Sequence, residues 1–287
     1  MNPFLAGTAA GLLIAFWGGY LLTGWTVRPL QTAFKKAGLI RKNYVGKSVP
    51  IGMGSALWLG LFFTTVPFFL ISDLLPIPWT MVQDLIGMLV VCTGFFVIGL
   101  LDDVVGNREV TGIRGHLRQL LKRRELTTGL IKAVAGIGVG LAGAWLIGAS
   151  GWKLVLDSAV IALSANMVNL LDLRPGRACK GALLLLALLG IFSLRAVESP
   201  GFWLLLGMVL AYFPDDLKAR TMMGDAGSNL LGGGIGFLVV ATCTLPVTLV
   251  WLLASLFLHL YAEKYSISDT IEKNKLLQWI DRLGRSA

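Results

Sequence analysis

Long blocks of apolar residues, separated by short polar loops, dominate this chain of 287 residues. A bilayer core about 30 Å thick needs roughly 20 apolar residues per helix, and about nine blocks reach or approach that length. Aliphatic, aromatic and Cys residues make up 55% of the chain and charged residues only 14%, against about 25% charged residues in a typical soluble protein. A soluble domain of this size leaves roughly a quarter of its unfolded surface exposed, too much to hide such an apolar sequence. We therefore predict an all-α polytopic membrane protein with about nine transmembrane helices, near residues 3–25, 51–72, 82–101, 130–149, 152–171, 179–197, 201–213, 227–245 and 247–262.

Lys and Arg residues fall in alternate loops. Loops 26–50 and 102–129, the segments after the fifth and seventh blocks, and the C-terminal tail carry nearly all of them, whereas the other loops hold only Lys153 and Arg195. Cytoplasmic loops carry an excess of Lys and Arg, so we expect a multi-pass protein of the cytoplasmic membrane with its N-terminus outside and its C-terminus inside. The net charge of +9 would also suit nucleic acid, but basic residues interspersed between apolar blocks indicate orientation instead, and we expect no nucleic-acid partner.

We divide the chain into a single transmembrane domain, residues 1–263, and a cytoplasmic tail, residues 264–287. In the tail, residues 266–285 predict an amphipathic helix. Its apolar side consists of Ile267, Ile271, Leu276, Ile280 and Leu283. Its basic residues, which would suit an anionic inner leaflet, are Lys273, Lys275, Arg282 and Arg285. A solvent-exposed tail helix is the alternative.

Acidic residues gather at the predicted cytoplasmic ends of the apolar blocks. Asp102 and Asp103 end the third block, Asp172 follows the fifth, and Asp225 precedes the eighth. Carboxylates near hydrocarbon are costly unless they are paired or bound to a metal. Several that converge from separate helices therefore predict a site for a divalent cation. Hard oxygen ligands without paired His or Cys favour Mg²⁺, or Mn²⁺, over zinc.

Two motifs lie at the ends of the third and fifth blocks. Adjacent side chains on a helix point about 100° apart, so Asp102 and Asp103 would serve different roles across a cleft; a solvated helix end is the alternative. Asn166, Asn169 and Asp172 are spaced by three and share one helical face. Buried amides need hydrogen-bond partners, which the phosphate and sugar hydroxyls of a ligand supply. Hydrogen bonds between helices are the alternative.

Two motifs that contain glycine precede the eighth and second blocks. Met223–Ser228 would present the free N–H groups of a helix N-terminus to an anion, and Asp225 could hold a metal that bridges phosphates. Capping of the helix by Asp225 or Ser228 is the alternative. Lys47, ahead of a glycine-rich turn, could bind phosphate as a point charge. A face of small residues in the fourth block predicts close packing of helices: Gly136, Gly140 and Ala144.

In their order and placement, these motifs resemble those of the polyprenyl-phosphate N-acetylhexosamine-1-phosphate transferase family, across nearly the whole chain. The stretch Lys47–Gly54 is similar to the family's K-x-T-P-T-x-G-G, and Asp102-Asp103 to its aspartate pair. The fifth block is similar to N-x-x-N-x-x-D-G-x-D-G-L through Asn166, Asn169, Asp172 and Gly176. The stretch Met223–Ser228 is similar to M-G-D-T-G-S and differs only at Ala226.

The resemblance implies a reaction for cell-wall or surface-glycan synthesis. A polyprenyl phosphate attacks the β-phosphate of a UDP-activated amino sugar at the cytoplasmic membrane face, giving a polyprenyl-diphospho-sugar and UMP with the help of Mg²⁺. By this resemblance, Asp225 is the main metal ligand. Asp102 or Asp103 binds or deprotonates the lipid phosphate, and Asp172 belongs to the same catalytic group of carboxylates. Asn169 and Asp172 line the nucleotide site, Lys47 contacts phosphate or nucleotide, and Asn166 also binds substrate.

The chain also departs from the family's pattern. Pro175 stands where the family has a second loop aspartate, and because Pro fixes φ and lacks an N–H, the loop must differ in shape. Arg174 and Arg177 flank it; their charges either orient the loop at the membrane or grip a substrate phosphate. The family's His-rich loop is missing too, since the chain contains only His116 and His259.

The leading hypothesis is a Mg²⁺-dependent sugar-1-phosphate transferase with an altered nucleotide-sugar pocket. The alternative is a catalytically altered relative that binds a lipid-linked precursor or scaffolds a wall-synthesis complex. A homodimer is left open. A transporter is disfavoured, because no acids or broken helices lie clearly at mid-membrane, where transport sites usually lie.

Overall fold

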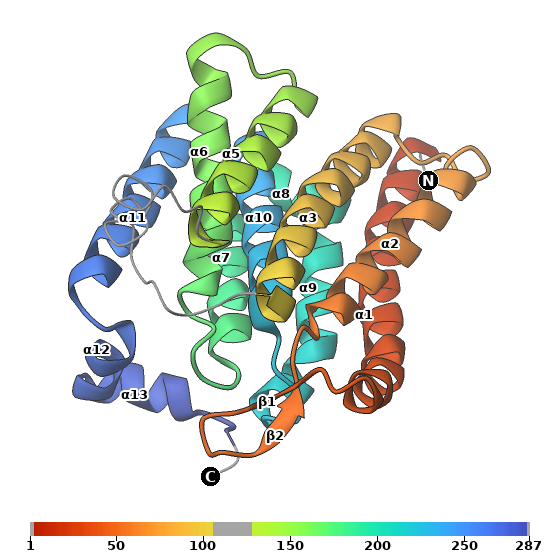
Figure 1. Ribbon diagram of the computed structural model, residues 1–287. Helices are drawn as coiled ribbons and strands as arrows, with labels where there is room; N and C mark the ends of the chain where they lie inside the picture. The colour runs from red at the N-terminus through yellow and green to blue at the C-terminus, as the bar shows by residue number, and fades with distance from the viewer. Residues whose placement is uncertain (1–2, 106–127, 286–287) are drawn as a thin grey trace.

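The computed structural model describes residues 3–105 and 128–285, which form a bundle of helices standing side by side (Figure 1). The described chain is almost entirely helical, as predicted. Its helices are α1 (Pro3–Lys36), α2 (Gly54–Ile71), α3 (Trp79–Val105), α5 (Thr128–Leu146), α6 (Gly151–Asn169), α7 (Arg177–Phe192), α8 (Leu194–Glu198), α9 (Pro200–Leu217), α10 (Gly224–Thr242), α11 (Leu245–Lys264), α12 (Ile267–Lys273) and α13 (Lys275–Arg282). Its strands are β1 (Ile40–Lys42) and β2 (Ser48–Pro50).

The hairpin of β1 and β2 is an addition to the predicted all-α fold. The two strands pair antiparallel, with Ile40 opposite Pro50. The turn between them forms because the side chain of Asn43 accepts hydrogen bonds from the backbone N–H groups of Val45 and Lys47, at 3.1 and 3.0 Å. Gly46 supplies the positive φ, 80°, that closes the turn.

Six helices of the described chain are long and apolar enough to cross a membrane: α1, α2, α3, α5, α6 and α11. The protein is therefore a multi-pass membrane protein. Each of the nine predicted blocks coincides with a helix, but α7, α9 and α10 are not among the six, so the count of nine stays a prediction. The orientation also stays a prediction. Much of the basic charge on which it depends lies outside the described residues: Arg108, Arg114, Arg118, Lys122, Arg123 and Arg124.

Helix α10 forms the centre of the bundle and packs chiefly against α3 and α6. From Gly224 to Val240 every residue except Asp225 is buried. Because other helices surround α10, it does not need large apolar side chains facing lipid. Its many glycines instead allow the neighbouring helices to pack close to it. Small residues let helix backbones approach closely. A Cβ on Gly232 would lie 2.2 Å from the carbonyl oxygen of Ser164 on α6.

The predicted small-residue face on α5 is confirmed. A Cβ on Gly140 would lie 2.6 Å from the carbonyl oxygen of Ser158 on α6, and Ala144 is fully buried. Gly136 faces the ring of Phe95 on α3. Helix α5 therefore packs against both α3 and α6 through residues that carry little or no side chain.

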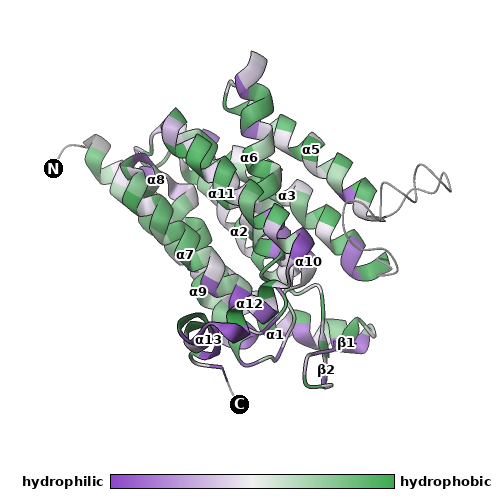
Figure 2. Ribbon diagram, turned by 90° about the vertical axis from the view of Figure 1, so that its left-hand side faces the viewer, coloured by the Kyte–Doolittle hydropathy of each residue, from purple (hydrophilic) through white to green (hydrophobic). Residues whose placement is uncertain are grey.

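Polar residues collect at one end of the bundle. Figure 2 shows hydrophobic residues along the long helices and hydrophilic residues around α12, α13 and the β1–β2 hairpin. The end of α1 and the start of α2 meet at this hairpin, and the ends of α6 and α9 and the starts of α7 and α10 lie at the same end of the bundle (Figure 1). The loops that carry the predicted site residues are therefore neighbours in space.

We predict that Gly232→Ala destabilises the bundle, because the added methyl would collide with the backbone of Ser164 and Ala165 and force α10 away from α6. The expected cost is about 1–3 kcal/mol of unfolding free energy. The matched control is Gly138→Ala on α5, where an added Cβ meets nothing within 4 Å. There the better helix former should leave the melting temperature unchanged or higher. Thermal melts of the detergent-solubilised protein followed by Trp fluorescence measure both variants, and equal melting temperatures would contradict the packing argument.

Candidate functional site

The site is organised around the first turn of α10. Gly224 begins this helix at a φ of 72°, and a Cβ there would lie 2.3 Å from a carboxylate oxygen of Asp103. Asp103, on α3, accepts hydrogen bonds from the backbone N–H groups of Asp225 and Ala226, both at 3.0 Å. The helix N-terminus that was predicted to meet an anion therefore meets the carboxylate of Asp103. Ser228 does not cap the helix, since its hydroxyl donates to Asn169 and to the carbonyl of Gly224, both at 3.0 Å.

Two further glycines bring neighbouring helices onto this turn. A Cβ on Gly99 of α3 would lie 2.2 Å from the carbonyl oxygen of Asp225, and a Cβ on Gly54 of α2 would lie 2.1 Å from the backbone nitrogen of Gly227. Neither distance leaves room for a side chain. The close approach places the motifs of the second, third and eighth predicted blocks in direct contact.

A cation-binding cluster lies beside this turn. The ammonium of Lys132, near the start of α5, contacts a carboxylate oxygen of Asp225 and lies 3.1 Å from a carboxylate oxygen of Asp102. All three side chains are about a quarter exposed, at 22%, 22% and 25%. The amide of Asn169, at the end of α6, donates to the same oxygen of Asp225 at 3.4 Å. Four helices thus contribute to one small polar cluster.

Asp172 lies just beyond α6 and lines a small cavity of about 70 Å³ with Arg174, Pro175 and Asp216. Burial raises the pKa of the Asp172 carboxyl well above its usual range, and the negative charges of Asp216, Asp225 and Asp103 raise this pKa further. A hydrogen bond to the backbone of Gly224 opposes the shift. The carboxylates of Asp103, Asp216 and Asp225 are therefore close enough to Asp172 to raise its pKa, although the four do not all bind one common partner.

The loop between α6 and α7 is held from both sides. Gly176 adopts a φ of 74°, and its N–H donates to the carboxylate of Asp216 at 3.1 Å. Arg174 lies over the ring of Tyr44 at 5.6 Å and 3.8 Å from Glu272 in the tail. Pro175 is therefore fixed between two anchored neighbours, Arg174 and Gly176.

Of the predicted site residues, the structure brings five together at the start of α10: Asp102, Asp103, Asn169, Asp172 and Asp225. The others lie elsewhere. Asn166 hydrogen-bonds His259 of α11 at 2.9 Å, and Lys47 lies in the exposed hairpin turn. Arg174 and Arg177 contact the C-terminal tail. Substrate binding by these four residues stays a prediction.

Lys132 and Asp216 belong to this region and were not predicted as site residues. Lys132 stands near the start of the fourth predicted block, in an otherwise apolar stretch. Asp216 follows Asp215 in a run of polar residues, and nothing in the sequence indicates that only Asp216, at 3% exposure, is buried. An isolated charge inside an apolar block is the signal that could have identified Lys132.

The fit of the cluster to a metal ion can be tested by its donors. Within residues 3–105 and 128–285, no three His, Cys, Asp or Glu side chains are arranged as a metal cluster. Asp102 and Asp225 nevertheless hold a cation between them, the ammonium of Lys132. Mg²⁺ is typically bound by one or two carboxylates together with waters and substrate phosphates. The donor set fits Mg²⁺ at the position of the ammonium and, without His or Cys, does not fit zinc.

We predict unequal losses of stability for substitutions at two adjacent residues. Asp103→Ala should lower the unfolding free energy by about 2–3 kcal/mol, because the start of α10 loses a buried charged acceptor for two N–H groups. Asp102→Ala removes one arm of a partly exposed ion pair and should cost less than about 1 kcal/mol. Thermal melts of the two variants in the same detergent measure the difference; equal losses would show that Asp103 does not anchor α10.

Comparison with known proteins assigns the family. The sequence matches the family model of glycosyl transferase family 4 over residues 85–243, which is more than half of the chain. The matched range contains α10 and every residue of the cation-binding cluster, whereas Lys47 and the tail lie outside it. No curated protein matches the chain. This chain, with its apolar helices, is therefore a multi-pass membrane transferase that belongs to glycosyl transferase family 4.

Proposed function

We propose that the protein transfers a sugar-1-phosphate from a UDP-activated sugar of the N-acetylhexosamine type to a polyprenyl phosphate and releases UMP. One observation carries this proposal: at the polar end of an apolar bundle, Asp102 and Asp225 from two helices share the ammonium of Lys132, and Asn169 from a third helix donates to Asp225. A lipid phosphate and a soluble nucleotide sugar can meet only where the membrane ends. The family supports a transferase at that place.

The reaction requires that two negatively charged phosphate groups approach each other. Bound between Asp102 and Asp225, Mg²⁺ would offset this charge as it does in phosphoryl transfer generally; Mn²⁺ has the same ligand preference. The Lys132 ammonium, which the two carboxylates would then no longer hold, would be available as a donor for a phosphate oxygen.

The structure supports different roles for the two adjacent aspartates. Both oxygens of Asp103 already accept backbone N–H groups, so this residue fixes the start of α10. Asp102 is a quarter exposed, and its side chain contacts Lys132 and Asp225 but, among the described residues, no backbone N–H group that an anchored carboxylate would hold. We therefore assign contact with the lipid phosphate, and any proton transfer from it, to Asp102.

The nucleotide side is assigned to Asn169 and Asp172. Asn169 is oriented by Ser228, which donates to its side-chain oxygen at 3.0 Å and leaves its amide nitrogen directed at Asp225. Asp172 lines the cavity next to this cluster. With the N-terminus outside, as the basic loops predict, this end of the bundle faces the cytoplasm, where nucleotide sugars are made.

A second candidate function is supported by the same ammonium. Lys132 neutralises the two carboxylates that would hold the metal, and Pro175 replaces an acidic residue of the family's loop. Both features suit a relative that binds a lipid-linked precursor without turning it over. Turnover distinguishes the two functions.

Asp225→Asn should abolish UMP release, because the metal loses one of its two carboxylates; a fall on the order of 100-fold or more is expected. The assay combines the purified full chain, polyprenyl phosphate, Mg²⁺ and a panel of UDP-sugars, and measures UMP. Asp73→Asn, the same change at an exposed residue between α2 and α3, is the matched control and should keep wild-type activity. If wild-type protein releases no UMP with any UDP-sugar, the transferase proposal fails.

Lys132 and the metal compete for the same two carboxylates. Lys132→Met should therefore tighten Mn²⁺ binding by roughly 5–30-fold, a coupling of about 1–2 kcal/mol, while it lowers turnover through the lost phosphate donor. Titration followed by Mn²⁺ paramagnetic resonance measures the affinity in wild-type and variant protein. An unchanged Mn²⁺ affinity would place the metal elsewhere.

A further inference from the structure

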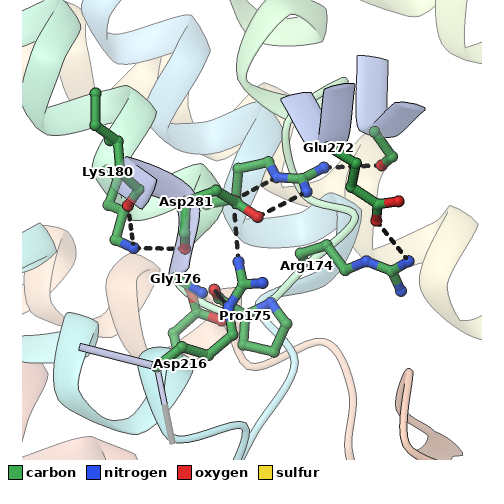
Figure 3. Close-up of polar contacts among 11 residues, drawn as sticks. Arg174, Pro175, Gly176, Lys180, Asp216, Glu272 and Asp281 are labelled. Atoms are coloured by element: carbon green, nitrogen blue, oxygen red, sulfur yellow. Dashed lines mark hydrogen bonds and ion pairs between the residues drawn. The ribbon is translucent and has the colours of Figure 1, made fainter. Parts of the chain in front are cut away.

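The C-terminal tail is docked against the loop that carries Asp172 (Figure 3). Arg177, at the start of α7, donates from Nε and Nη2 to the two carboxylate oxygens of Asp281 on α13, at 2.8 and 3.1 Å. Its Nη1 donates to the hydroxyl of Ser268 on α12 at 2.9 Å. The side chains of Arg177 and Asp281 are only 5% and 9% exposed. All three guanidinium nitrogens are thus engaged with the tail.

Two more basic residues reinforce this pair. Lys180 donates to the carbonyl oxygens of Ile280 and Asp281, at 2.9 and 2.8 Å, and so satisfies the C-terminal end of α13. Arg285 donates to the carboxylate of Asp281 at 3.0 Å. Burial alone would raise the pKa of the Asp281 carboxyl, but the guanidinium groups of Arg177 and Arg285 outweigh it and lower this pKa below its usual value. Asp281 is therefore ionised at neutral pH.

The tail also holds the α6–α7 loop directly. Arg285 donates from Nε to the carbonyl oxygen of Pro175 at 3.1 Å, and Glu272 lies 3.8 Å from Arg174. Figure 3 shows Arg174, Pro175 and Gly176 between the tail on one side and Asp216 on the other. The loop that begins with Asp172 therefore depends on α12 and α13 for its outer support.

Between the tail and the loop lies a cavity of about 420 Å³, a size typical of small-molecule sites. Its lining is Tyr44, Arg174, Glu272, Gln278, Asp281, Arg282 and Arg285. Tyr44 and Arg174 also line the smaller cavity of Asp172, so the two cavities adjoin. The side chain of Arg282 is exposed and makes no hydrogen bond or ion pair with residues 3–105 and 128–285. Because Asp281 is already neutralised by Arg177, the cavity carries an excess of positive charge.

We propose that the docked tail is a wall of the site for the soluble, negatively charged substrate. Arg177 and Asp281 are positioning residues that act through the tail on the Asp172 loop, and Arg282 binds an anionic group of the substrate in the cavity. That this substrate is a nucleotide sugar rests on the proposed function. Arg177 then acts on the substrate indirectly, in place of the direct phosphate grip predicted from the sequence.

The first experiment compares Asp281→Asn with Asp269→Asn, the same change at an exposed residue of the same tail. Hydrogen–deuterium exchange over residues 266–285 should be faster in Asp281→Asn only. The KM for the UDP-sugar should rise on the order of 10-fold, while Mn²⁺ affinity at the Asp102–Asp225 cluster stays unchanged. Arg177→Gln should reproduce both effects, and the double variant should be no worse than the more affected single variant.

The second experiment does not depend on tail docking. Arg282→Ala removes an exposed side chain and should leave the melting temperature and tail exchange unchanged. The affinity for UDP, measured by calorimetry on the full chain, should fall roughly 5–10-fold. Lys275→Ala removes the same charge from α13 outside the cavity and is the matched control.

These readouts separate this proposal from the proposed function. If no UDP-sugar is turned over but UDP binds, and Arg282→Ala lowers the affinity for UDP, the proposed binding site in the cavity is supported and the transferase proposal fails. If Asp281→Asn speeds hydrogen–deuterium exchange in the tail while KM and UDP affinity stay at wild-type values, the tail only stabilises the structure and the proposal is overturned. Unchanged tail exchange in Asp281→Asn, or equal UDP affinity in Arg282→Ala and wild-type protein, overturns it as well.

Discussion

The contact between the Asp103 carboxylate and the first turn of α10 is the interaction on which the site depends. A helix N-terminus carries free N–H groups and a partial positive charge, and both need a partner when the helix is buried. Asp103 supplies that partner from α3, at 3.0 Å to each of two N–H groups. The contact requires Gly224, since a Cβ there would overlap the carboxylate. A packing requirement of the central helix thereby brings Asp102 and Asp225 to the same place.

The charges of the cluster are balanced unevenly. Lys132 compensates Asp102 and Asp225, and the helix N-terminus compensates Asp103. Asp172 has no basic partner among the described residues. Its burial, and then the negative charges of three nearby carboxyl groups, raise its pKa. The charged form of such a carboxyl group is disfavoured, and a bound cation or a hydrogen-bond donor on a substrate would stabilise it.

The site residues that could be predicted from sequence are those whose polar side chains cost free energy to bury, whatever their partners. Asp103, Asn169 and Asp225 stand out because an acid or amide at the end of an apolar block needs a partner. Which partner each one has depends on how helices pack, and periodicity along one helix does not contain that information. Arg177 was predicted to contact phosphate or to orient the loop, but it binds Asp281, more than one hundred residues later. The β1–β2 hairpin was missed for a different reason, because two strands of three residues are too short to show a period.

The tail helps to hold the α6–α7 loop, and with it Asp172, in place. Proline at position 175 lacks an N–H and stiffens the chain, so the loop has one donor fewer with which to satisfy its own carbonyl groups. The carbonyl of Pro175 is instead bound by Arg285, and the N–H of Gly176 by Asp216. The family match ends at residue 243, so the residues that stabilise this loop on its outer side come from a part of the chain that the family does not describe. A loop inside the matched range is thus held by contacts from residues outside it.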